Sequence, residues 1–142
     1  MSAFSNLPPQ AVLPLAAYPL DRLARDAARA DQAVLRADLE PARDRGEVLS
    51  ILAREFRLPH HAGRCLDSLR DSLTVMKPPA DASEPGFVVI LQHLPQTPQF
   101  DAGERTALLD VFRDAAEHFF DRRTAFRVFY SLSARGKAAA GD

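Results

Sequence analysis

Two aspartates four residues apart form the most chemically suggestive pair in the sequence. Asp67 and Asp71 lie in the run Leu58-Pro59-His60-His61-Ala62-Gly63-Arg64-Cys65-Leu66-Asp67-Ser68-Leu69-Arg70-Asp71-Ser72-Leu73. On a helix, side chains at i and i+4 project from the same face, so the two carboxylates would point together and could bind a cationic group. Arg64 and Arg70, each three residues from Asp67, also allow a simpler interpretation, which is ion pairing within one solvated helix.

Cys65 in the same run could act as a nucleophile. The first turn of a helix stabilises a thiolate through the helix dipole and nearby amide groups. His60 and His61 are the nearest bases, so a small thiol enzyme is one hypothesis. The alternative is a half-buried apolar side chain, because Cys65 lies four residues before Leu69. We favour this alternative and predict no catalytic residue.

Signatures of other enzyme classes are missing from the sequence. It contains no GxGxxG, GxxxxGK[ST], HExxH, CxxC or GxSxG motif. No carboxylate lies at ligand spacing beside the histidines, so we predict neither a metal site nor a cofactor. The 18 basic and 19 acidic residues leave a net charge of −1. Nucleic-acid binders usually carry a basic stripe, so direct binding of RNA or DNA is not expected.

Composition also constrains the compartment. The longest uninterrupted apolar run is Phe87 to Leu91, far shorter than the ~20 residues that span a bilayer. The first basic residue is Arg22, and prolines break the apolar stretch before it, so we predict no secretory signal. A single cysteine cannot form an internal disulfide, which fits a reducing compartment. These features predict a cytoplasmic protein without a membrane partner.

Helical and strand patterns alternate along the chain. Proline content predicts an extended, mobile arm over residues 1–18, followed by an amphipathic helix from Leu20. A strand is predicted over residues 33–39, a helix over 48–58, and a second helix from Gly63 to Met76 whose leucine stripe faces inward.

The second half of the chain predicts a strand, a helix and a strand. Residues 87–91 are suited to a strand that is buried on both faces. Asp101, with Glu104 three residues later, forms a capping-box pattern that opens the longest helix, and a last strand follows over residues 126–132. With right-handed crossovers, this order predicts an α/β fold with a three-stranded parallel sheet covered by helices, plus an extra N-terminal helix.

The run from Leu58 to Leu73 resembles the barstar family of ribonuclease inhibitors, whose motif is approximately LPxYYGxNLDALWDCL. The matching positions are Leu58, Pro59, Gly63, Leu66, Asp67, Leu69, Asp71 and Leu73. A second stretch, residues 111–115 (VFRDA), is similar to the family's VFREA. The resemblance covers about residues 34–132. It implies an N-terminal arm and helix over residues 1–33, a barstar-like domain over 34–133 and a flexible tail over 134–142.

The resemblance implies an inhibitor rather than an enzyme, acting on a basic microbial ribonuclease. An acidic helix and the loop before it would occlude the active site, with Asp67 and Asp71 standing in for RNA phosphates. Asp114 would take the place of the family's Glu, and Gly63 would let the backbone turn tightly near the partner. The family's own complexes are the precedent for such charges steering association. A rim carboxylate such as Asp81 should matter less than Asp71.

Several positions depart from the family motif. His61 and Ala62 replace aromatic residues, and Arg70 replaces a tryptophan, although interfaces concentrate their energy in buried aromatic anchors. Arg64 and Arg70 add positive charge where a cationic enzyme would dock. A barstar-fold interaction module with a non-ribonuclease partner is therefore the alternative hypothesis. The predicted partner-binding residues are His61, Gly63, Asp67, Arg70, Asp71 and Asp114.

Overall fold

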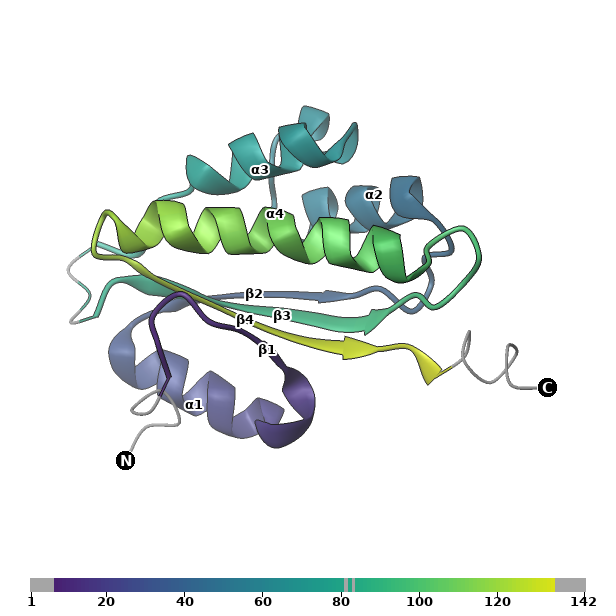
Figure 1. Cartoon of the computed structure of the whole chain (residues 1–142). Helices are drawn as coiled ribbons and strands as arrows, with labels where there is room; N and C mark the ends of the chain where they lie inside the picture. Colours follow the sequence, from purple (N-terminus) through teal and green to yellow (C-terminus); the bar gives the residue numbers. More distant parts are fainter. Residues whose placement is uncertain (1–6, 81, 83, 135–142) are drawn as a thin grey trace.

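The core of the protein is a four-stranded parallel sheet with helices on both faces (Figure 1). The computed structural model describes residues 7–80, 82 and 84–134. The strand order across the sheet is β1 (Val12–Pro14), β4 (Ala125–Leu132), β3 (Gly86–Leu94) and β2 (Ala33–Asp38), and every neighbouring pair is parallel.

Four α-helices surround this sheet. On one side lie α2 (Arg45–Glu55), α4 (Ala102–Phe120) and, stacked over α4, α3 (Leu66–Thr74), whereas α1 (Leu20–Ala30) covers the opposite side (Figure 1). Two short 3₁₀ helices, η1 (Leu15–Ala17) and η2 (His60–Gly63), complete the described elements. The predicted α/β class, the parallel sheet and the extra N-terminal helix are confirmed.

The sheet has one strand more than the sequence predicted. Val12 pairs with Val128, and backbone N–H groups of β4 donate to the carbonyls of Pro9 and Ala11. Prolines in this segment obscured a strand, but proline is tolerated on a sheet edge, where one side of the strand makes no ladder hydrogen bonds. The proposed division of the chain at residue 33 stays a prediction. The outer parts of the predicted arm and tail, residues 1–6 and 135–142, lie outside the described residues.

The central strand β3 is buried on both faces, as its continuous apolar run predicted. Phe87 and Val89 face the main core beneath α2 and α4, whereas Val88 and Ile90 pack with Leu23 and other residues on the α1 side. Fully burying one such side chain contributes about 1.5–3 kcal/mol, so the two cores hold both helical layers on the sheet.

The inward stripe of α3 is also confirmed. Leu69 and Leu73 are fully buried, and Leu66 and Met76 pack against the same core. The predicted start at Gly63 is wrong, because Cys65 has extended backbone angles (φ −161°, ψ 169°) and separates η2 from α3. The segment is therefore two helical pieces rather than one.

The N-terminus of α4 ties two helices together. The Asp101 carboxylate accepts a hydrogen bond from the Glu104 backbone N–H at 3.0 Å, so the predicted N-cap is confirmed. The Glu104 side chain accepts two hydrogen bonds from Arg45 at 2.6 and 2.7 Å. This bidentate pair links the first turns of α2 and α4.

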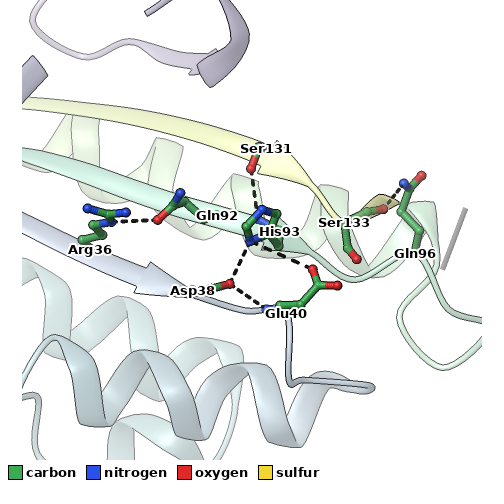
Figure 2. A network of polar contacts seen from close by, with 8 residues as sticks. All are labelled: Arg36, Asp38, Glu40, Gln92, His93, Gln96, Ser131 and Ser133. Carbon is green, nitrogen blue, oxygen red and sulfur yellow. Dashed lines mark hydrogen bonds and ion pairs between the residues drawn. The ribbon is translucent and has the colours of Figure 1, made fainter. Parts of the chain in front are cut away.

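A polar network fixes the carboxyl end of β2, where the chain turns toward α2 (Figure 2). His93, in left-handed backbone conformation (φ 60°), places Nδ1 2.9 Å from Asp38 Oδ1, and its backbone N–H donates to Ser131 Oγ. The Glu40 backbone N–H also donates to Asp38 Oδ1. The hydrogen bond with His93 and then that from Glu40 lower the pKa of Asp38. The network thus joins the ends of three strands.

Replacing Gly86 with alanine should destabilise the sheet. A Cβ at this position would lie 2.7 Å from the Ala125 backbone oxygen and 2.8 Å from the Ala125 Cβ, in a buried strand pair. We expect Gly86→Ala to lower the free energy of unfolding by about 1–3 kcal/mol, as overpacking does, measured by urea denaturation. As a control, Gly46→Ala on the exposed surface of α2 should be neutral or stabilising by up to ~1 kcal/mol. Equal stability of the two variants would contradict this prediction.

Candidate functional site

The candidate site is the surface formed by η2, α3 and the middle of α4, on the side of these helices that faces away from the sheet (Figure 1). Burial of Leu69 and Leu73 turns the opposite side of α3 toward solvent. The predicted residues of α3 therefore lie on an accessible surface.

One arginine connects two of the predicted carboxylates. Arg70 donates to Asp67 Oδ1 at 2.8 Å and to Asp114 Oδ2 at 3.3 Å, so its guanidinium bridges α3 and α4. The side chains of Asp67 and Asp114 remain 80% and 56% exposed. Exposed ion pairs contribute about 0–1 kcal/mol, so a partner could rearrange this bridge at little cost.

Asp71 differs from these two carboxylates. It is exposed on the turn of α3 that follows Asp67, and among the described residues its carboxylate makes no ion pair. Its backbone carbonyl accepts a hydrogen bond from the Thr74 hydroxyl. The carboxylate itself is therefore accessible to a partner.

The reason given for Gly63 is wrong. None of the described glycines has a positive φ, so no tight left-handed turn requires glycine at this position. A Cβ on Gly63 would be in ordinary contact, 3.7 Å from the Leu49 backbone oxygen and from the Ser50 Cα. The role of Gly63 in binding a partner stays a prediction.

The two adjacent positions where the family motif has tyrosines, 61 and 62, differ in burial. Ala62 in η2 is fully buried, whereas His61 in the same element is exposed. The His61 Nε2 lies 3.4 Å from the hydroxyl of Ser72, which is buried on α3. His61 thus links η2 to α3 and still presents part of its ring to solvent.

Cys65 is the N-cap of α3, and the prediction of a half-buried position is wrong. The thiol is exposed, and Sγ accepts a hydrogen bond from the Ser68 backbone N–H at 3.4 Å. Sγ also lies 3.2 Å from Ser68 Oγ. Hydrogen bonding to the Ser68 hydroxyl, and then to its N–H, lowers the pKa of Cys65. Within the described chain, neither His60 nor His61 hydrogen-bonds this sulfur, so the thiol-enzyme hypothesis lacks a positioned base.

Two clefts between α2 and η2 were not predicted. One, of about 390 Å³, is lined by Ser50, Ala53, Arg54, Leu58, His60, Gly63 and Arg64. The other, of about 460 Å³, is lined by Pro41, Asp44, Gly46, Glu47, Ser50, Ile51 and Gly63. The contribution of α2 was missed, although its polar residues Ser50 and Arg54 have the i, i+4 spacing that places them on one face.

Two further properties concern the part of the chain that the structure describes. There, no group of three or more His, Cys, Asp or Glu side chains is arranged to hold a metal ion. None of the helices in that part combines the length and apolar character needed to cross a membrane.

Comparison with known proteins identifies the family. Residues 32–131 match the Barstar (barnase inhibitor) family model. The chain belongs to the barstar family. The matched range includes β2, β3, most of β4 and all predicted partner-binding residues, so the barstar-like fold is confirmed. At the level of the family, barstars are inhibitors of barnase-type ribonucleases rather than enzymes. A comparison with curated proteins gave no match.

Substitutions of Cys65 should reveal its capping role. Serine is a preferred N-cap residue, so Cys65→Ser should keep or slightly raise the free energy of unfolding. Cys65→Ala removes the acceptor for the Ser68 N–H and should cost about 1 kcal/mol. Urea denaturation of the two variants measures the difference. If Cys65→Ala is as stable as the wild-type protein, the sulfur does not contribute as a cap.

Proposed function

We propose that this barstar-family protein inhibits a basic ribonuclease by occluding its active site with α3 and η2. The observation that carries the proposal is the grouping of Asp67, Asp71 and Asp114 as exposed carboxylates on one surface. Residues far apart in the sequence supply this surface, and it lies within the range that matches the family.

The mechanism requires no covalent chemistry. A ribonuclease binds the phosphates of RNA with arginine and lysine side chains, and exposed carboxylates can occupy the same positions. By its position in the family motif, Asp71 would make the most deeply buried contact. Among the described residues, no arginine of its own chain competes for this carboxylate. Inhibition would be reversible, competitive with RNA and complete at one inhibitor per enzyme.

Arg70 reduces the negative charge of this surface. While Arg70 pairs with Asp67 and Asp114, it offsets part of their charge. Docking of a cationic enzyme would draw the carboxylates away from Arg70 and leave its guanidinium at the rim. Arg70 would therefore reduce electrostatic steering of a basic target.

The single cysteine supports a location inside the cell. Cys65 is exposed and makes no disulfide within the chain, which fits a reducing compartment. We propose that the inhibitor acts in the cytoplasm, where it would protect cellular RNA from the target enzyme.

A second candidate function keeps the fold and changes the partner. The site has His61 and Arg70 where the family motif has aromatic residues, and the other aromatic position is the buried Ala62. Aromatic anchors usually supply much of the binding energy at an interface. Their replacement favours a protein partner other than a ribonuclease.

The deciding experiment adds the purified protein to a panel of basic microbial ribonucleases. The proposal expects loss of RNA cleavage by at least one enzyme at a one-to-one molar ratio. Absence of inhibition across the panel, together with affinity capture of a partner that is not a nuclease, would instead support the interaction module.

Substitution of Asp71 should weaken the complex strongly. Removing the carboxylate leaves a buried cation of the enzyme without a partner, which costs about 3–5 kcal/mol. We expect Asp71→Ala to raise the inhibition constant by the corresponding factor of more than about 100. Asp81, the rim position considered above, lies outside the described residues. Asp21→Ala on α1, on the opposite side of the sheet, is the matched control and should change the constant little. Equal losses in the two variants would contradict the assignment of Asp71.

Removal of the Arg70 guanidinium should strengthen binding to a basic ribonuclease. Arg70→Gln frees Asp67 and Asp114 and makes the surface more negative, so association at low salt should become several-fold faster. Because screening shortens the range of exposed charges, the gain should shrink as ionic strength rises. Stopped-flow association rates at two salt concentrations measure the effect. Slower association of the variant would show that Arg70 itself contacts the target, as the alternative function requires.

A further inference from the structure

A basic cleft borders the acidic surface. Arg54 extends from α2 along one wall of the 390 Å³ cleft, and His60 and Arg64 contribute to the other wall, on and after η2. Arg64 directly precedes Cys65, the N-cap of α3. The cleft is therefore continuous in sequence with the helix that carries Asp67 and Asp71.

The residues that line this cleft include two arginines and no carboxylate. Arg54 pairs with its neighbour Glu55 at 3.3 Å, but the side chains of His60 and Arg64 make no ion pair with the described residues. The closest candidate in sequence, Asp67, pairs with Arg70 instead.

The acidic residues of the adjoining cleft are also engaged elsewhere. The Asp44 carboxylate accepts the backbone N–H of Glu47 and so caps α2. The Glu47 carboxylate pairs with Arg43 at 3.2 Å. Neither acidic side chain of the second cleft therefore forms an ion pair with Arg64 in the described part of the chain.

We propose that this cleft receives an acidic side chain of the protein partner, a carboxylate held by Arg54, Arg64 and His60. The inference rests on the proposed function, because it gives the target a second point of charge recognition beside its cationic active site. Guanidinium groups match carboxylates well, since their planar N–H donors form paired charge-assisted hydrogen bonds.

The neighbouring charges favour a protein over a nucleic acid as the occupant. A polyanionic strand that extended from the cleft along α3 would meet the exposed carboxylates of Asp67 and Asp71, which repel phosphates. A protein can present one carboxylate to the basic cleft and, beside it, a cationic patch to the acidic surface. The two areas together would fix the orientation of the partner, because the reversed orientation places like charges against each other.

Charge reversal tests the cleft on a ribonuclease that the protein inhibits. Arg64→Glu should raise the inhibition constant roughly tenfold or more, because it sets a carboxylate against the partner's carboxylate. The matched control, Arg22→Glu on α1, makes the same charge change on the opposite side of the sheet and should have little effect. If Arg64→Glu tightens binding while Asp71→Ala weakens it, the cleft faces a cationic surface. The inference then falls and the proposed function stands.

A second arm needs no ribonuclease. Decaglutamate and decalysine peptides are titrated into the ¹⁵N-labelled protein, and the arginine Nε–H signals are followed by NMR. Decaglutamate should shift the signals of Arg54 and Arg64 selectively, with no matching change at Arg22, and the shift of Arg54 should be lost in Arg64→Gln.

The peptide titration separates the two hypotheses. A selective shift without inhibition of any ribonuclease would contradict the proposed inhibition of ribonucleases. It would still support binding of carboxylates in the cleft. Equal shifts at all exposed arginines, or none at Arg54 and Arg64, would overturn the inference.

Discussion

The site depends on the burial of one side of α3. Leu69 and Leu73 are fully enclosed between α3 and the core, so the helix cannot rotate without exposing them. This constraint fixes Asp67 and Asp71 on the solvent side, because residues at these spacings lie on opposite faces of one helix. The same packing sets α3 over α4 and brings Asp114 within reach of Arg70. An apolar interaction therefore determines the arrangement of an acidic surface.

Charge on this surface is divided rather than uniform. Arg70 holds two of the three carboxylates, and Asp71 makes no such pair with described residues. Across the N-cap of α3, the cleft between α2 and η2 carries the opposite charge through Arg54 and Arg64. The surface proposed to bind the partner therefore carries both signs of charge in this member of the barstar family. Such an interface gains specificity from its geometry, because a partner must match both areas in one orientation.

Local patterns predicted the elements well where one period dominated. The sequence correctly predicts the buried strand β3 from its continuous apolar run, the inward face of α3 from its leucine stripe, and the N-cap at Asp101. Sequence patterns failed to predict the conformation where contacts with other parts of the chain determine it. Pro14 obscured β1, which forms because β4 offers a free edge, and the extended backbone of Cys65 separates η2 from α3. The assumed need for a glycine at position 63 also failed, because this residue has no positive φ and a Cβ there would make only ordinary contacts with α2.

By itself, the sequence determined the α/β class, the family resemblance and the presence of two aspartates on one helical face. Those features depend on residue types and on spacings within single elements, which the chain order contains directly. Only the tertiary structure decided that Arg70 bridges Asp67 and Asp114, because Arg70 and Asp114 are 44 residues apart in the sequence. It also decided that Arg54 and Arg64 line the same cleft. Contacts of this kind depend on how separate helices pack against the sheet, and the periodicity of one helix carries no information about the position of another.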